Sequence, residues 1–188
     1  QDIQNMVMNI TDNLINYLPL YGQKILITAG PTYEKIDAVR FIGNFSSGKM
    51  GCEIAKKSAQ YGAEVDLVLG PSSQDVKHPL VNVIRVENAS DMLQVCQTKF
   101  NSCNIAIFAA AVADFKPVKL FNHKLKKKSL TIHTQPNQDI ISTLTKNKKE
   151  QFIVGFALES ENEELNAIQK LKKKKMDLII LNSINNKE

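Results

Sequence analysis

The segment 43–50, GNFSSGKM, has residue types and spacing that suit phosphate binding. In its Gly-x4-Gly-Lys pattern, backbone N–H groups and a lysine surround a phosphate. However, Met50 stands where a nucleotide-hydrolysing loop needs a hydroxyl for Mg²⁺, and the preceding apolar run ends at Thr28, about fifteen residues upstream. Two interpretations are therefore favoured. The segment is the amino terminus of a helix that offers N–H groups to an anion, or a serine-capped helix packed closely on a sheet.

Two further segments have side chains suited to an anionic ligand. Residues 109–115, AAAVADF, end an apolar run in small side chains and Asp114. Small side chains allow a flat ring to lie near the backbone, and an acid there can hold a ribose hydroxyl or a metal; close helix–sheet packing explains the small residues equally well. Four lysines lie within 124–128, and Lys170 and Lys174 share one face of a predicted helix. These lysines neutralise phosphates or form a solvated surface.

Residue patterns for nucleophilic or metal catalysis are not recognisable in the sequence. The three histidines have no ligand-type spacing, and Cys52, Cys96 and Cys103 form no Cys-x-x-Cys pair. No Ser-His-Asp or Cys-His arrangement is evident. We therefore expect chemistry by orientation and charge neutralisation, as in phosphoryl or nucleotidyl transfer.

The elements that must position these residues follow from hydrophobic patterning. Short runs rich in Ile and Val alternate with segments of helical spacing, which predicts β-α-β units around a buried parallel sheet. The predicted strands are 24–28, 64–70, 81–86, 104–113, 152–157 and 176–181, and the predicted helices are 47–61, 90–100, 139–146 and 161–175. Residues 114–135 break the alternation and predict a lysine-rich flap above the sheet. In such folds ligands bind beyond the carboxyl ends of the strands.

Length and composition indicate a single α/β unit that binds a small anion. The chain has 188 residues, 43% of them hydrophobic, and a formal net charge of +5. Only Arg40 and Arg85 are arginines and tryptophan is absent, which disfavours a nucleic-acid partner. No apolar run is long enough to cross a membrane and no secretory signal is visible, so we expect a cytoplasmic location. Residues 1–18 predict a separate amphipathic helix.

These residues together resemble the phosphopantothenate–cysteine ligase family, the synthetase half of bifunctional bacterial coenzyme A biosynthesis proteins. The matching segments are 27–51, 108–117, 124–128, 137–141, 154–160 and 175–182. The resemblance implies a Rossmann-like three-layer α/β fold with a mostly parallel central sheet. It also implies that the carboxylate of 4′-phosphopantothenate attacks CTP in the presence of Mg²⁺. The resulting acyl-cytidylate then reacts with L-cysteine to give 4′-phosphopantothenoylcysteine.

The resemblance also implies roles for individual residues. Asn44, Arg40 and Lys124 would be catalytic, with Asn44 hydrogen-bonding the acyl-cytidylate and Lys124 on the triphosphate. The positions that match the family's nucleotide pocket are Phe108, Ala109, Ala110, Asp114, Lys124, Gln138, Asp139, Ile140, Ile141, Phe156, Lys170 and Lys174. Gln138 departs from the proline that the family usually has there. Metal ligands are not predicted.

The same resemblance predicts how the chain is organised. Residues 1–22 would connect to a preceding FMN-dependent phosphopantothenoylcysteine decarboxylase domain. Residues 23–188 would be the CTP-binding synthetase domain without its carboxyl-terminal part. A homodimer is expected, with the flap of one subunit closing the site of the other. One alternative is a Rossmann-type dinucleotide-binding oxidoreductase, although residues 28–32, TAGPT, replace the expected Gly-x-Gly-x-x-Gly motif. Another is an RNA-binding module that uses the lysine runs.

Overall fold

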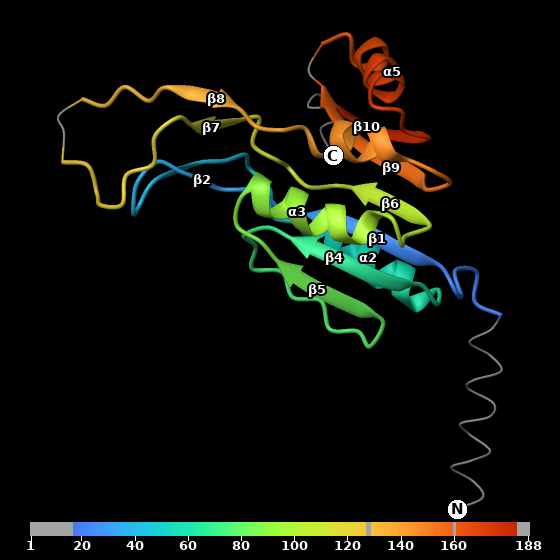
Figure 1. The fold of residues 1–188 in the computed structure, drawn as a ribbon. Coiled ribbons are helices and arrows are strands. Elements are labelled where there is room, and N and C mark those ends of the chain that lie inside the picture. The colour runs from blue at the N-terminus through green and yellow to red at the C-terminus, as the bar shows by residue number, and fades with distance from the viewer. Residues whose placement is uncertain (1–16, 127–128, 160, 184–188) are drawn as a thin grey trace, which may run out of the picture.

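The centre of the molecule is a six-stranded sheet in the order β10-β9-β6-β1-β4-β5, with every neighbouring pair parallel (Figure 1). The computed structural model describes residues 17–126, 129–159 and 161–183, so the helix predicted for 1–18 lies almost wholly outside the described residues. The strands are β1 (Lys24–Ala29), β4 (Glu64–Leu69), β5 (Val81–Arg85), β6 (Ile105–Phe108), β9 (Phe152–Glu159) and β10 (Leu178–Ser183). Each predicted apolar run supplies one of them.

Helices cover both faces of the sheet because alternate residues of its central strands are apolar in both directions. On one face, Leu26 of β1 belongs to a core that includes Met92 and Phe100 of α3 (Ala89–Phe100) and residues of α4 (Ile140–Leu144). On the other face, Ile27 lies in a core with Ala55 of α2 (Lys49–Gln60). The α5 helix (Glu163–Lys173) packs along β9 and β10. The predicted three-layer α/β fold is confirmed.

All four predicted helix starts are wrong by one or two residues, and for α2 and α3 the cap gives the local reason. The α2 helix begins at Lys49, and its N-cap is Gly48 in the left-handed region (φ 76°), with no side-chain cap. A side chain is strained in that conformation, so glycine takes the place that a serine was expected to fill. The α3 helix is capped by Asn88, whose side-chain oxygen accepts from the N–H of Asp91 (2.9 Å). Asp139 caps α4, which continues as a short 3-10 turn (Thr145–Asn147).

The strand predicted for 104–113 also ends early, at Phe108. Residues 109–113 continue in an extended path beside residues 28–32 without a regular ladder. Ala111 donates its N–H to the carbonyl of Gly30 (2.8 Å), and Ala113 donates to the hydroxyl of Thr32 (2.9 Å). The apolar run therefore serves two purposes, a core strand followed by a segment along the sheet's carboxyl edge.

Two small antiparallel sheets lie outside the central one. They are β2 (Glu34–Lys35) with β3 (Phe41–Ile42), and β7 (Phe115–Pro117) with β8 (Thr134–Pro136). In Figure 1, β7 and β8 form the root of a long arm that extends away from the sheet, with β2 beside it. This arm is the predicted flap, residues 114–135, of which 127–128 are outside the description. In the described part of the chain, no helix is both long and apolar enough to cross a membrane.

The order of the strands fixes where a ligand can enter. From β1 the chain moves through α2 to β4 on one side, whereas β6, β9 and β10 follow one another on the other side. The direction of winding therefore reverses between β1 and β6. In open parallel sheets the carboxyl ends of the strands at such a reversal flank the ligand crevice.

Candidate active site

A cleft of about 730 Å³ opens at this reversal. It is lined by the carboxyl ends of β1, β6 and β9, the segment 109–114, the turn before α4, and one side of α5. Twelve of the fourteen predicted site residues line it: Asn44, Phe108, Ala109, Ala110, Asp114, Gln138, Asp139, Ile140, Ile141, Phe156, Lys170 and Lys174. They come from five separate parts of the sequence, and the parallel topology brings them together.

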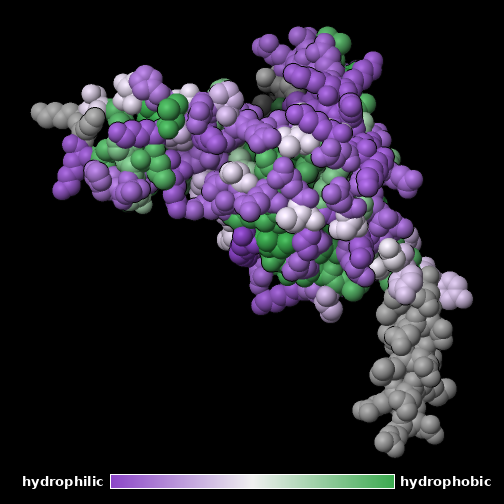
Figure 2. Space-filling view, in the orientation of Figure 1, coloured by the Kyte–Doolittle hydropathy of each residue, from purple (hydrophilic) through white to green (hydrophobic). Residues whose placement is uncertain are grey.

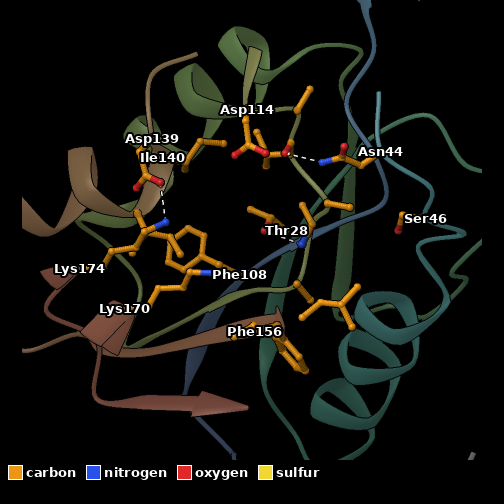
Figure 3. A pocket seen from close by; sticks show the side chains of 18 of the residues that line it. Thr28, Asn44, Ser46, Phe108, Asp114, Asp139, Ile140, Phe156, Lys170 and Lys174 are labelled. Carbon is orange, nitrogen blue, oxygen red and sulfur yellow. Dashed lines mark hydrogen bonds and ion pairs between the residues drawn. The ribbon is translucent and has the colours of Figure 1, made fainter. Parts of the chain in front are cut away.

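Hydrogen bonds to β1 and to the loop after it hold the floor of the cleft. Ala109 donates its N–H to the carbonyl of Thr28 (3.1 Å), and Ala110 donates to the Thr28 hydroxyl (3.4 Å). Because the side chains of 109–111 are methyl groups, the backbone there is open to a ligand on its free side. The aromatic rings of Phe108 and Phe156 lie nearby (Figure 3). This floor suits a flat, largely apolar group such as a nucleobase.

Asn44 lies at one side of the cleft, on the segment between β3 and α2. Its side-chain amide donates one N–H to the carbonyl of Val112 (2.9 Å), and this exposed side chain has a second N–H and its amide oxygen to offer a ligand. Ser46 and Met50, on either side of the α2 N-cap, line the same part of the cleft. The positive end of the α2 dipole therefore borders the cleft, as the anion-binding interpretation of 43–50 predicts.

Basic side chains reach the opposite side of the cleft from α5. Lys174 pairs with the carboxylate of Asp139 (Nζ to Oδ2, 2.5 Å), and Lys170 lies one turn away (Figure 3). Burial acts to raise the pKa of Asp139, but the hydrogen bonds from Lys174 and from the N–H of Ser142 lower it overall. Asp139 therefore remains ionised at neutral pH and fixes the position of Lys174. An anion would lie between these lysines and Asn44.

The structure adds residues that the sequence prediction omitted. Asn137 lines the cleft and donates its side-chain amide to the carbonyl of Ala113 (2.8 Å), which holds the turn before α4 against the floor. Asn182, near the end of β10, and Ser46 line it too. A polar residue directly after or late in a buried strand was the available signal for Asn182. Asn137 lay next to two predicted residues and carried no signal of its own.

Arg40 and Lys124, both predicted to be catalytic, do not line the cleft. The Arg40 guanidinium pairs with Asp37 (2.6 Å) between β2 and β3. Lys124 is exposed on the flap. The family-based roles of these two residues thus have no support from the geometry of a single subunit.

The cleft has the groups to bind and orient an anionic ligand. Among the described residues that line it there is no cysteine and no histidine. Burial raises the pKa of Cys96 to about 12 and that of Cys103 to about 11, so both thiols are protonated at neutral pH. Among the described residues no group of three His, Cys, Asp or Glu side chains is placed to hold a metal ion. The expected chemistry, in which substrates attack each other, remains consistent with this arrangement.

Comparison with known proteins identifies the family. The profile of the DNA/pantothenate metabolism flavoprotein C-terminal domain matches residues 20–188. The chain belongs to this family. It is 44% identical over 168 residues to the coenzyme A biosynthesis bifunctional protein CoaBC of Bacillus subtilis, covering 88% of this chain and 41% of that protein. The crystal structure of a CoaBC C-terminal domain superposes with a TM-score of 0.76 at 42% identity, covering 85% of this chain and 76% of that one.

Another relative of this chain has a different name. It is called a cysteine/cysteine sulfinic acid decarboxylase, from an unknown prokaryotic organism, and is 45% identical over 97% of this chain and 52% of its own length. The chain thus spans about half the length of the curated relatives it matches. Activities named for those whole proteins therefore include regions that lie outside this sequence.

Membership of this family agrees with the absence of a dinucleotide fingerprint. In a Rossmann dinucleotide site the first strand leads directly through a glycine-rich turn into a helix. Here β1 is followed by Gly30 and Pro31 and then by β2 and β3, and α2 begins only at Lys49. The helix that would receive a pyrophosphate is thus separated from its strand by the segment that carries β2 and β3. Nothing in the structure favours the oxidoreductase alternative.

Proposed function

We propose that this chain carries the phosphopantothenate–cysteine ligase activity of a coenzyme A biosynthesis protein. The observation that carries the proposal is the composition of the cleft. An amide (Asn44), two lysines (Lys170 and Lys174) and a helix amino terminus surround an apolar floor, and the described lining contains no cysteine or histidine. A reaction between two bound substrates needs this set of groups, and relatives with more than 40% identity are named for coenzyme A biosynthesis.

The proposed reaction has two steps. The carboxylate of 4′-phosphopantothenate attacks the α-phosphorus of CTP, forming an acyl-cytidylate and releasing pyrophosphate. The amine of L-cysteine then attacks the acyl carbon, forming the amide bond and releasing CMP and a proton. Negative charge develops on the departing pyrophosphate in the first step, and on the carbonyl oxygen and the departing CMP in the second. Fixed cations and amide donors stabilise this charge. Neither step needs an attacking atom from the protein.

We assign the parts of the nucleotide to the parts of the cleft. The cytosine ring lies on the backbone of 109–110, between the side chains of Phe108, Ile140 and Ile141. The phosphates lie toward Lys170 and Lys174. Asn44, across the cleft, then faces the reacting carbonyl group. The small floor, the basic side and the amide side lie in the right order for this assignment.

The magnesium ion fits this chain only as a companion of the substrate. Asp114 and Asp139 are carboxylates of the cleft, and Asp139 is already paired with Lys174. Mg²⁺ usually keeps several waters and binds through one or two carboxylates together with substrate phosphates. We therefore propose that Mg²⁺ arrives with CTP and that Asp114 is the side chain available to it.

We further propose that the active unit is a homodimer. Side chains at the root of the flap and along it are apolar and exposed, among them Phe115, Val118 and Leu120. Figure 2 shows hydrophobic residues gathered on this arm, apart from the body of the molecule. A second subunit would cover them and would bring Lys124 of one flap to the cleft of the other subunit. Light scattering coupled to size-exclusion chromatography tests this, and a monomer at micromolar concentration would contradict it.

The remaining proposals concern the protein as a whole. Residues 1–22 would join this domain to a preceding FMN-dependent decarboxylase, and residues 23–188 would form the CTP-binding domain. The FMN site would lie in the decarboxylase domain. All three cysteines are free, which agrees with a reducing compartment such as the cytoplasm.

Release of pyrophosphate from CTP tests the proposed function. With phosphopantothenate and Mg²⁺ but no cysteine, the protein should release pyrophosphate and retain a radiolabelled cytidylate. Addition of cysteine should then release CMP. No pyrophosphate release under these conditions would overturn the proposal. Two controls separate other activities: titration with NADH for the oxidoreductase alternative, and carbon dioxide release from cysteine for the decarboxylase name of one relative.

A further inference from the structure

A buried carboxylate, Asp37, lies outside the cleft in the turn between β2 and β3. The residue is only 1% exposed. Its Oδ1 accepts from the N–H groups of Val39 and Arg40 (both 2.9 Å), and its Oδ2 accepts from the Arg40 guanidinium (2.6 Å) and from the N–H of Leu125 (3.1 Å). Three of these donors come from its own turn. The fourth comes from the flap, 88 residues further along the chain.

Leu125 is held at both of its main-chain polar atoms. Its N–H donates to Asp37, and its carbonyl accepts long hydrogen bonds from both terminal nitrogens of Arg40 (3.4 and 3.5 Å). Its side chain is buried, whereas Lys124 and Lys126 on either side of it are exposed. The Asp37–Arg40 pair therefore binds the flap at Leu125, while the neighbouring lysines remain exposed to solvent.

The described flap meets the same region of the molecule at other points, since β7 packs against β2 and β3. The N–H of Phe121 donates to the carbonyl of Ile36 (3.0 Å), in the same turn, and β7 pairs with β8 at the root of the arm. Burial acts to raise the pKa of Asp37, but the N–H groups of Val39, Leu125 and Arg40 and the Arg40 charge lower it overall. The ionised carboxylate is the stronger acceptor, and charge-assisted hydrogen bonds are the strong ones.

We propose that Asp37 is a positioning residue that acts through Leu125 to hold Lys124 where it meets the nucleotide triphosphate. Arg40 is the partner of Asp37 in this contact among Asp37, Arg40 and Leu125, which we call the latch. The proposal rests on the proposed function and on the proposed homodimer, in which Lys124 of one flap reaches the cleft of the other subunit and binds the triphosphate there. Ordering a loop costs conformational entropy, so a flap that is already held at Leu125 lowers the cost of binding the nucleotide.

A double-mutant cycle tests whether Asp37 acts through Lys124. Asp37→Asn places an amide N–H where Leu125 and Arg40 donate, and should raise the KM for CTP about tenfold while the KM for cysteine stays within about twofold. In a Lys124→Gln background the same substitution should raise the KM for CTP by less than about twofold. Equal effects in both backgrounds would overturn the proposal, because a general loss of stability adds to the effect of any other change.

Hydrogen exchange tests the latch without reference to activity. Asp37→Asn should speed amide exchange in residues 121–126 and leave exchange in β1 unchanged. Arg40→Lys leaves the buried carboxylate paired with a cation and removes only the fork on the Leu125 carbonyl, so it should speed exchange in 121–126 less. The matched control is Asp75→Asn, an exposed aspartate paired with Lys77, which should change neither region.

The two measurements separate the two proposals. If the parent protein releases no pyrophosphate from CTP, the proposed function fails, and unchanged exchange in 121–126 would independently overturn the latch. If the parent is active and both variants exchange like it at 121–126, the latch is wrong and the ligase proposal stands.

Discussion

The cleft and the flap differ in how the chain fixes their residues. The floor of the cleft is carried by strand ends and by segments bonded to β1, so its geometry follows from the core packing of the sheet. The flap projects from the sheet and is joined to the region of β2 and β3 by hydrogen bonds to Asp37, Arg40 and Ile36 and by the packing of β7 on these two strands. A rigid cleft, the proposed nucleotide site, is thus combined with a separately anchored arm that carries lysines.

The difference suggests a division of labour between binding and closure. Residues built on a sheet keep their positions when one ligand leaves, which suits recognition of a base. An arm held at few points can rearrange when charge is added or removed, which suits a triphosphate that leaves as pyrophosphate. Substitutions in the cleft should therefore change chemistry or affinity directly, and substitutions at the flap should act through the position of the arm.

The largest expected effect is at Asn44. Asn44→Ala removes the amide that would face the reacting carbonyl in the proposed reaction, and it also removes the donor to the carbonyl of Val112. We expect kcat for ligation to fall about 100-fold or more, the usual size for loss of a donor to a developing oxyanion. Steady-state assay of phosphopantothenoylcysteine formation measures it. Asn82→Ala at the opposite edge of the sheet, where Asn82 donates to Asp66, is the matched control and should keep the parent rate. An Asn44→Ala variant with the parent kcat would show that the reaction does not depend on Asn44, and would contradict its proposed role in the cleft.

The next effect concerns the packing that brings α2 to the cleft. A Cβ at Gly51 would lie 2.5 Å from the Cβ of Ala29, so the helix must move away from β1. Gly51→Ala should therefore destabilise the fold by about 1–3 kcal/mol. Urea unfolding followed by circular dichroism measures this. The exchange of residues 121–126 in the flap should stay at the parent rate, and faster exchange there would show that the two regions are not independent.

A smaller effect, on the KM for CTP, is expected from substitution of Lys174 on the basic side of the cleft. Lys174→Gln removes one cation near the proposed phosphate position and leaves Asp139 without its partner. The KM for CTP should rise about tenfold with little change in the KM for cysteine. Lys172→Gln is the control, since Lys172 is exposed on the same helix and does not line the cleft. If both variants behave alike, net charge rather than the position of Lys174 governs binding.

The same contrast explains how far the sequence could predict the molecule. Apolar runs predicted all six central strands, because a buried parallel strand must be apolar on both faces. Strand ends then predicted the cleft, since parallel strands place their carboxyl ends at one edge. The start of α2 was predicted with a serine cap, but Gly48 was needed because the backbone there is left-handed. No periodic pattern describes such a turn.

The flap shows where the sequence signal ends. Arg40 and Lys124 were assigned from the family resemblance. A resemblance implies a role for a residue but does not say where its side chain lies in the fold. Hydrophobic periodicity gives no register for an irregular arm, so the contact between Asp37 and Leu125 had no counterpart in the sequence. A polar residue whose important hydrogen-bond partner lies far along the chain, as Leu125 does from Asp37, cannot be recognised from the residues next to it in sequence.

The smallest expected effect is the pH dependence that Asp139 gives to stability. Its pKa is lowered in the folded protein, so its contribution is fully present above the unfolded value of about 3.9 and is lost as the pH falls through the lower folded value. Because the side chain is partly exposed, Asp139→Asn should cost only about 0.5–1 kcal/mol at pH 7. At a pH below the folded pKa the variant and the parent should be equally stable. Denaturant titrations at several pH values test this, and a constant difference between the two proteins would show that Asp139 acts through its shape and not through its charge.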